Sequence, residues 1–410
     1  MPATDYQGSP SHSSFSSFGR SLLSRTRDSP AHPTMLPSGG EADVDAFQRH
    51  VAVTLAELRD GEEFLSLAWI RRLLEAFLQC QDEFRVVVAQ ARRRGGAGGG
   101  GAQAERLVAE YHERAVKALD VCNAARDGVD QVRRWGRLAG IAASVLAAPG
   151  EIHEGQLRRA RKALSDLSVL LVDDAAAAAA GGGGVASFLA SHRNRSFGRG
   201  ARASPSRNSS VSSSSSSSSS HFRSLSWSVS RTWSAARQLQ AIGSGLAAPR
   251  AHEAGLAAPV YAMGCVLHLA SWALVAAVPC PDRGAALQAH HLPAVPPRAP
   301  FAWAPPLLAL QDRLTEEGKR KDRRNSCGLL KEIHALEKCA QRLAEAIDAA
   351  ATPLSAESEA EVREAAAELA AVCAAMKDGL EPLERQVRDV FHRIVRSRME
   401  GFDSPMSNAD

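Results

Sequence analysis

The 410-residue sequence has few aromatic residues and little β-strand character. Aromatic residues make up 5% of the chain, whereas hydrophobic residues together make up 45%, with alanine and leucine prominent. Stretches in which β-branched residues alternate with polar ones, which are typical of half-buried strands, are hard to find. The composition therefore favours helices over sheets, and we expect an all-α protein.

Cysteine is scarce and irregularly spaced. The seven cysteines are odd in number and never occur in the CxxC spacing of zinc sites and redox pairs. The sequence therefore predicts neither a disulfide framework nor a metal site, and a reducing compartment is expected. Several cysteines occupy apolar helical positions, where a free cysteine acts as a small hydrophobic residue.

The short motifs of catalysis and cofactor binding are also missing. No HExxH, GxSxG, P-loop or kinase pattern occurs. Gly96, Gly98 and Gly101 formally match GxGxxG, but they follow an arginine-rich helix end inside a glycine run, so they do not indicate a dinucleotide site. No nucleic-acid-binding signature accompanies the basic residues. We expect a non-enzymatic protein with no cofactor, no metal, no small-molecule substrate and no nucleic-acid partner.

Acidic residues are absent from residues 175–237, where arginines punctuate a serine-rich tract. Such a composition cannot bury enough apolar surface to offset the entropy of ordering, so we predict a disordered Ala/Gly/Ser/Arg-rich linker over residues 175–228. Within it, the patterns RNRS, RASP and RSLS make Ser196, Ser204 and Ser226 candidate phosphorylation sites. A phosphate on a few of these serines would remove the local positive charge.

The N-terminal residues lack a continuous apolar run and a cleavage pattern, which argues against a secretory signal. Residues 1–42 are rich in serine, proline and glycine, and we predict a disordered tail there. Their serine and arginine content also resembles a plastid transit peptide, which is the weaker alternative. A short disordered tail is predicted at residues 402–410.

Two helical parts flank the predicted linker and are expected to form one bundle. In the first part, residues 43–174, an apolar stripe begins near Ser66, and further helices are predicted over residues 103–146 and 151–172. The second part, residues 229–401, completes the bundle. Long helices joined by loops fold back on each other, so we expect an antiparallel long-helix bundle.

The C-terminal third has the clearest helical periodicity. Its apolar residues alternate steps of three and four along two helices, as in coiled coils. Ser355 is predicted to cap the second helix, Pro382 to bend it and Gly401 to end it. We interpret the apolar rows as a candidate partner-binding seam formed by Leu329, Ile333, Leu336, Leu369, Met376, Leu380, Leu383, Val387 and Val390.

The most apolar stretch is residues 261–278, within the run 254–281 that has no charged residue. Pro259 fits the first turn of a helix and Pro279 would end one, so the helix would have about 20 residues, the minimum for crossing a bilayer. Length alone therefore leaves two alternatives open, a helix in the protein core and a single membrane span.

The side chains in this stretch favour the core helix. Gly264, His268 and Ser271 form a small and polar stripe, and a histidine near the centre of a bilayer is costly unless it is paired. We expect Trp272, together with Trp69 and Trp233 elsewhere, to be a packing anchor. The candidate residues of this membrane or core helix are Tyr261, Gly264, His268, Ser271, Trp272 and Val278.

Five separated segments carry a resemblance to a known family. They are MPATDYQGS, LSLAWIRRLLEAFLQCQDEFRVVV, RTWSAARQLQAIGSGL, ASWALVAAVPCPDR and EEGKRKDRRNSCGLLKEIHALEKCAQRL. In this order they resemble the plant ROH/BYPASS-like family, and they are closer to its ROH branch. The long glycine and serine insertions depart from the family pattern.

The resemblance implies a helical, non-enzymatic plant protein. Members of the ROH branch are associated with exocyst subunits of the Exo-seventy type and with polarised secretion of cell wall or mucilage, so an exocyst subunit is the expected partner. We expect a location in the cytosol and peripherally at membranes. The alternative is a single-pass membrane protein, spanning at residues 261–278, that acts in BYPASS-like developmental signalling.

Overall fold

A computed structural model describes part of the chain in detail. The chain divides into two units, Met1–Ser38 and Gly39–Asp410, and all described residues belong to the second. Helices account for 83% of the described residues, and none of these residues forms a strand, so the predicted all-α fold is confirmed. The described residues are 39–61, 63–94, 100–179, 233–250, 255–296, 299–320, 327–350 and 353–402.

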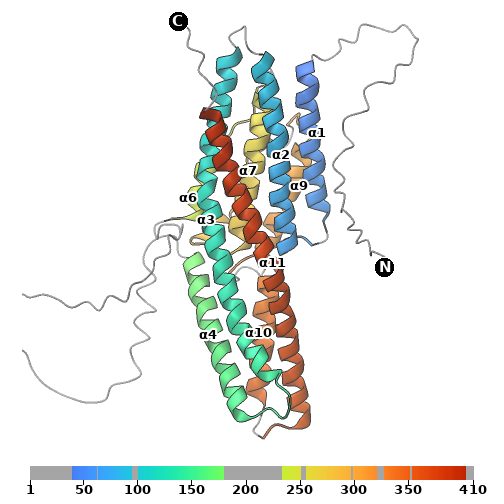
Figure 1. Cartoon of the computed structure of the whole chain (residues 1–410), viewed down its shortest axis with the longest axis vertical. Helices are drawn as coiled ribbons and strands as arrows, with labels where there is room; N and C mark the ends of the chain where they lie inside the picture. The colour runs from blue at the N-terminus through green and yellow to red at the C-terminus, as the bar shows by residue number, and fades with distance from the viewer. Residues whose placement is uncertain are drawn as a thin grey trace, which may run out of the picture. The chain divides into compact units, whose positions relative to one another are not determined.

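The helices are labelled in chain order in Figure 1. They are α1 (Gly39–Asp60), α2 (Leu67–Arg94), α3 (Gly100–Leu146), α4 (Glu154–Ala179), α6 (Ala235–Gly243), α7 (Ala257–Ala277), α8 (Arg283–Ala286), the 3-10 turn η1 (Ala289–His291), α9 (Ala304–Lys319), α10 (Lys331–Ala349) and α11 (Ala356–Phe402).

Two helices of 47 residues each, α3 and α11, lie side by side and organise the second unit (Figure 1). At a rise of 1.5 Å per residue each is about 70 Å long. Helices α4 and α10 pack along one half of this pair, and α1, α2, α6, α7 and α9 surround the other half. The short loops between α3 and α4 and between α10 and α11 reverse the chain direction, which gives the antiparallel bundle that the sequence predicts.

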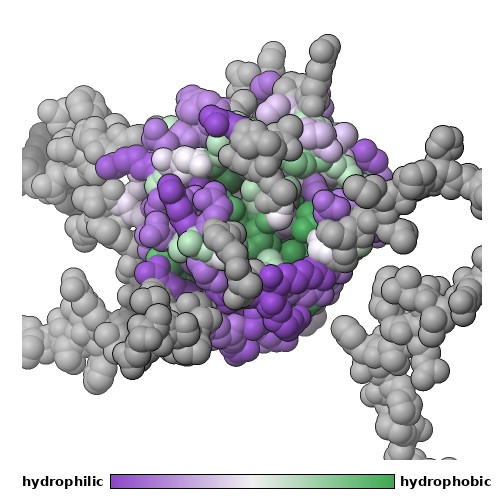
Figure 2. Space-filling view, turned by 90° about the horizontal axis from the view of Figure 1, so that it is seen from above, coloured by the Kyte–Doolittle hydropathy of each residue, from purple (hydrophilic) through white to green (hydrophobic). Residues whose placement is uncertain are grey.

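The apolar faces of these helices meet in one core. Its largest fully buried side chains include Trp69, Trp135, Trp272 and Trp303. Trp69 and Trp272 were expected to be packing anchors, and each indole N–H donates to a backbone carbonyl, at 2.9 Å and 3.1 Å. Figure 2, a view onto one end of the molecule, shows hydrophobic residues near the centre and hydrophilic residues around them. This is the distribution expected of amphipathic helices around a core.

Helix ends follow local chemistry, with small departures from the expected boundaries. The predicted cap of α11 is confirmed, because the Ser355 hydroxyl accepts a hydrogen bond from the backbone N–H of Ser358 at 3.1 Å. Helix α11 continues through Pro382 and ends at Phe402, one residue beyond the expected stop at Gly401. Helix α6 begins only after Ser234, whose hydroxyl accepts from a backbone N–H of the first turn.

Three helices extend into segments that the sequence predicts as disordered. Helix α11 reaches Phe402, the first residue of the predicted tail 402–410. Helix α1 begins at Gly39, inside the predicted tail 1–42, and an acidic residue in its first turn suits the helix dipole. Helix α4 continues to Ala179, inside the predicted linker 175–228, because alanine has the highest helix propensity. The remainder of these three predicted segments lies outside the described residues.

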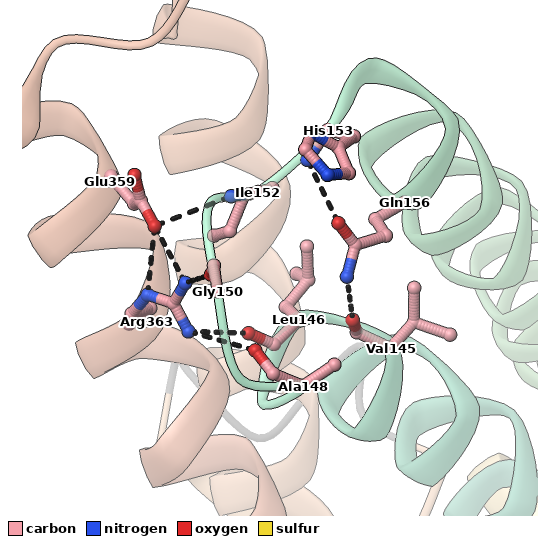
Figure 3. A network of polar contacts seen from close by, with 9 residues as sticks. All are labelled: Val145, Leu146, Ala148, Gly150, Ile152, His153, Gln156, Glu359 and Arg363. Atoms are coloured by element: carbon pink, nitrogen blue, oxygen red, sulfur yellow. Dashed lines mark hydrogen bonds and ion pairs between the residues drawn. The ribbon is translucent and has the colours of Figure 1, made fainter.

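A polar network ties the α3–α4 loop to α11 (Figure 3). The guanidinium of Arg363 donates to the backbone carbonyls of Leu146, at 3.4 Å, Ala148, at 3.2 Å, and Gly150. These carbonyls follow the end of α3 and have no partner within the helix. Glu359 accepts from Arg363 at 2.6 Å and from a backbone N–H of the loop at 3.3 Å. The network fixes the turn at which the chain reverses.

Candidate functional site: the buried helix α7 and a groove between α3 and α11

Helix α7 is the apolar segment for which core and membrane placements were both open. Among the described residues it is the one helix long and apolar enough to cross a bilayer, and its most apolar window is 100% buried. Helices α1, α2, α3, α6 and α8 contact it. Pro259 lies in its first turn, and the helix ends at Ala277, directly before Val278 and Pro279. In this structure α7 is a core helix covered on all sides by protein.

Three polar side chains of α7 find partners inside the protein. The hydroxyl of Tyr261 and the indole N–H of Trp272 donate to backbone carbonyls of the segment that follows α7, at 2.9 Å and 3.1 Å. Ser271 donates to the carbonyl one turn earlier in its own helix at 2.8 Å. Buried donors satisfied in this way do not oppose burial, so Tyr261, Ser271 and Trp272 are compatible with a place in the core.

Small residues allow close approach at two places, one in the N-terminal half of α7 and one just past its C-terminal end. A Cβ on Gly264 would lie 2.6 Å from a methyl carbon of Leu246. At the other end, Val278 packs against Gly128 of α3, where an added Cβ would lie 2.8 Å from the Val278 side chain. These contacts pack α7 closely against α3 and against the segment that contains Leu246.

His268 is buried in the middle of α7 and is 3% exposed. Neither ring nitrogen has a hydrogen-bond partner among the described residues. Burial, with a further contribution from the charge of Arg114, lowers the pKa of His268 to about 4, so the ring is neutral at pH 7. His290 and His291 line the same small pocket, but no three metal-binding side chains in the described part of the chain are arranged to hold an ion.

The nine residues of the expected partner-binding seam also lie in the core. Each has an exposed fraction of 4% or less, because α10 packs on α4 and α11 while α11 packs on α2 and α3. In this structure these residues hold the bundle together, and Val387 also lines a groove between α3 and α11. That they bind an external partner stays a prediction. The residues are Leu329, Ile333, Leu336, Leu369, Met376, Leu380, Leu383, Val387 and Val390.

An open groove lies between α3 and the C-terminal part of α11 and has a volume of about 570 Å³. Its apolar lining comes mainly from Val387, Phe391, Val395 and Met399, which follow one another at four-residue steps along α11. Exposure rises along this row from 3% at Val387 to 62% at Met399. The groove therefore opens to solvent toward the end of α11.

The charges in this groove have one sign. Arg126 of α3 and Arg388 and Arg396 of α11 line it, together with His392, and no acidic residue does. Arg388 is paired outside the groove, with Glu384 at 3.0 Å. We call this site the α3–α11 groove.

A second open groove, on the α2 side of α11, has the opposite character. Its volume is about 490 Å³, and both Asp82 and Glu400 line it beside arginines. Glu400 pairs with Arg85 at 2.5 Å, and Asp82 pairs with Arg393. The charges of this groove are largely neutralised within the chain, unlike those of the α3–α11 groove.

Sequence reasoning missed Phe391, Val395 and Met399 of the α3–α11 groove. It followed the row of α11 that steps by three and four through Val387 and Val390, which is the core row. The signal that could have found the groove is a second apolar row beginning at Val387 with a strict four-residue step. Such a row drifts away from the core face around the helix.

The cysteines described by the structure are not activated. Burial raises the pKa of the Cys122, Cys265 and Cys280 thiols to about 12. A thiol is nucleophilic only as the thiolate, so these three are inert at neutral pH. They pack as small hydrophobic residues, as the sequence suggests.

The three candidate phosphorylation sites, Ser196, Ser204 and Ser226, lie outside the described residues. They stay predictions from the sequence pattern.

These observations define a class of protein. It is an all-helical bundle, and in the part that the structure describes its candidate binding sites are grooves on the surface. The chain belongs to the ROH1-like family, because the family model described as Protein ROH1-like matches residues 1–404. It is 45% identical to Protein ROH1D of Arabidopsis thaliana, with 98% of each chain covered, and 35% identical to Protein ROH1A of the same plant over 88% of this chain and 89% of that one. No solved structure matches it. The resemblance found in the sequence is thus confirmed at the level of the family.

Proposed function

We propose that this protein is a non-enzymatic adaptor that binds a helical partner. The observation that carries the proposal is the α3–α11 groove, an open apolar cleft between two long helices. Grooves of this kind accept an amphipathic helix from another protein. Nothing in this groove suggests chemistry, because its one thiol, Cys122, is protonated at neutral pH and its other polar groups are arginines, an asparagine and a histidine.

The proposed partner is an exocyst subunit of the Exo-seventy type, and the proposed role is modulation of polarised secretion of cell wall or mucilage. Both come from the resemblance to the ROH branch, and membership of the ROH1-like family supports them. Phosphorylation of Ser196, Ser204 or Ser226 in the basic serine-rich segment would regulate this role by removing positive charge.

The proposed location is the cytosol, with peripheral association with membranes through the partner. The burial of α7 supports this location over a single membrane span, since a spanning α7 would leave the apolar faces of five contacting helices without their common neighbour. A role in BYPASS-like developmental signalling as a single-pass protein is the alternative, and no described contact favours it.

The direct test is binding of the purified full chain to several Exo-seventy-type subunits, measured by titration calorimetry. A different exocyst subunit, purified in the same way, is the matched control. The proposal predicts a saturable complex with at least one Exo-seventy-type subunit and none with the control. Absence of binding to every Exo-seventy-type subunit would remove the exocyst partner.

A second test concerns membrane placement. Microsomes from plant cells that express the tagged chain are extracted with alkaline carbonate. A peripheral protein is released, whereas a spanning protein stays in the pellet. Retention of the parent chain, together with release of a variant carrying Leu267→Arg and Leu274→Arg, would show that α7 spans a membrane.

A further inference from the structure

We infer that the α3–α11 groove binds an acidic amphipathic helix of a partner protein, with Phe391, Val395 and Met399 as the apolar contacts and Arg126 and Arg396 as the charge contacts. The inference rests on the proposed adaptor function. It adds the surface of this chain that is used and the chemistry of the segment that occupies it.

The dimensions suit a short helix. The apolar row from Val387 to Met399 covers twelve residue steps of α11, which corresponds to about 18 Å or a little over three helical turns. The walls are two neighbouring helices, and a third helix packs into such a depression with its side-chain ridges in the groove. An occupant with apolar residues at positions i, i+4, i+7 and i+11 would place one face along the whole row.

The charge pattern selects an acidic occupant. Arg126 and Arg396 line the groove, and no acidic residue lines it. Within the described part of the chain, neither arginine makes an ion pair. The groove on the α2 side shows the contrast, because there the chain supplies Asp82 and Glu400 as counter-charges. Carboxylates flanking the apolar face of a partner helix would supply the negative charges that the α3–α11 groove lacks. The arginines of the groove would repel a basic helix.

A lipid surface is the less suitable occupant. Peripheral proteins bind bilayers through protruding apolar and basic residues, whereas Val387 is 3% exposed at the closed end of this groove. A flat bilayer could reach Met399 but not the inner half of the row. The geometry therefore favours a narrow occupant such as a helix.

The first experiment uses two fluorescent peptides of about 16 residues that differ only in charge, and it uses the full chain. Both carry leucine at positions i, i+4, i+7 and i+11, and the remaining positions are mainly glutamate in one and lysine in the other. We expect fluorescence anisotropy to show at least tenfold tighter binding of the glutamate peptide, with weaker binding as salt is raised. Equal affinities for the two peptides would overturn the inference.

The second experiment uses a matched pair of substitutions. Met399→Glu places a carboxylate in the apolar row and should weaken binding of the glutamate peptide at least tenfold. Val172→Glu on α4 is the control, because Val172 is 61% exposed, nearly the same as 62% for Met399, and does not line the groove. Both positions face solvent, so both variants should fold, which circular dichroism verifies. Equal binding by the two variants contradicts the assignment of the groove.

A charge exchange tests the role of Arg396 specifically. Arg396→Glu should weaken binding of the glutamate peptide and strengthen binding of the lysine peptide, which a general loss of structure cannot do. The same substitution at Arg158, an exposed residue of α4 paired with Glu154, should change neither affinity. A loss of binding to both peptides in Arg396→Glu would contradict the charge argument.

The two proposals fail in distinguishable ways. If an Exo-seventy-type subunit binds the parent chain and Met399→Glu equally, the adaptor function stands and the groove assignment is wrong. If the glutamate peptide binds as described but no Exo-seventy-type subunit does, the groove stands and the exocyst partner is wrong. If Met399→Glu loses binding to phosphatidylserine vesicles but keeps the peptide, the surface is a lipid contact and the inference is overturned.

Discussion

Replacing Gly128 with alanine should loosen the packing of α7 against α3, whereas the same change at Gly136 of α3 should stabilise the protein. A Cβ at Gly128 would lie 2.6 Å from the carbonyl oxygen of Pro279 and 2.8 Å from a methyl carbon of Val278. At Gly136 an added Cβ meets nothing within 4 Å. Both glycines lie in the interior of one helix, so the pair isolates the contact with α7.

The expected magnitudes follow from two effects. Alanine in place of glycine inside a helix stabilises by about 0.5–1 kcal/mol, and both variants share this gain. At Gly128 the new methyl group must push back a backbone carbonyl, and overpacking of this kind costs about 1–3 kcal/mol. The free energy of unfolding of Gly128→Ala should therefore lie about 1–3 kcal/mol below that of Gly136→Ala.

Urea unfolding followed by far-ultraviolet circular dichroism measures this difference. With a slope of about 3 kcal/mol per molar urea, the midpoints of the two variants should differ by about 0.3–1 M. Gly140→Ala, also on α3 and also without a neighbour within 4 Å, repeats the control. If Gly128→Ala unfolds at the same urea concentration as the two controls, the end of α7 does not pack on α3, and the description of α7 as a core helix is wrong.

Three further predictions concern buried or bridging polar groups. Gln81→Met should raise the free energy of unfolding by about 1–3 kcal/mol, because the Gln81 amide is 1% exposed and has no partner among the described residues; an unchanged urea midpoint would contradict this. His268→Leu should make the free energy of unfolding fall less steeply in acid. The pKa of His268 is about 4 in the folded state against an ordinary value of 6.5, so the unfolded chain takes up the proton first as the pH falls. Between pH 7 and 4 the free energy of unfolding of the parent should therefore drop by about 3 kcal/mol relative to that of the variant. Urea midpoints measured across this pH range would refute the reasoning if the two slopes were equal. Arg363→Ala should speed amide hydrogen exchange in residues 146–152 without a similar effect from Arg385→Ala, whose arginine pairs only with an exposed glutamate one turn away; equal exchange in both variants would show that the network in Figure 3 does not hold the loop.

Local chemistry determined most helix boundaries from the sequence. Pro259 and Pro279 bracket α7, and Ser355 caps α11, because each acts through its own backbone or through the next turn. The errors in the predicted helix boundaries are a few residues long and have local causes too. For example, the alanine run at the end of α4 extends this helix to Ala179. The sequence also showed that catalytic motifs are missing and that five segments follow one another in a characteristic order. The five segments indicated the ROH/BYPASS-like family without knowledge of any tertiary contact.

The sequence could not determine what covers each apolar face. The row through Leu369 and Val387 and the row through Phe391 and Met399 are both apolar and both helical. Leu369 and Val387 are at most 3% exposed, whereas Met399 is 62% exposed, because the position of a face around the helix axis decides which neighbour it meets. The sequence therefore indicated the buried row, and only the structure shows that the row through Phe391 and Met399 reaches the surface.

The same limit applied to α7. Twenty apolar residues satisfy the requirements of a bilayer and of a protein core equally well, since both solvents are apolar and both need satisfied backbone groups. By itself, the sequence determined that one uninterrupted apolar helix lies between Pro259 and Pro279 in an all-helical member of this family. Only the tertiary structure decided that other helices enclose it, because enclosure depends on contacts such as that of Val278 with Gly128, between residues that are far apart in the chain and brought together by folding.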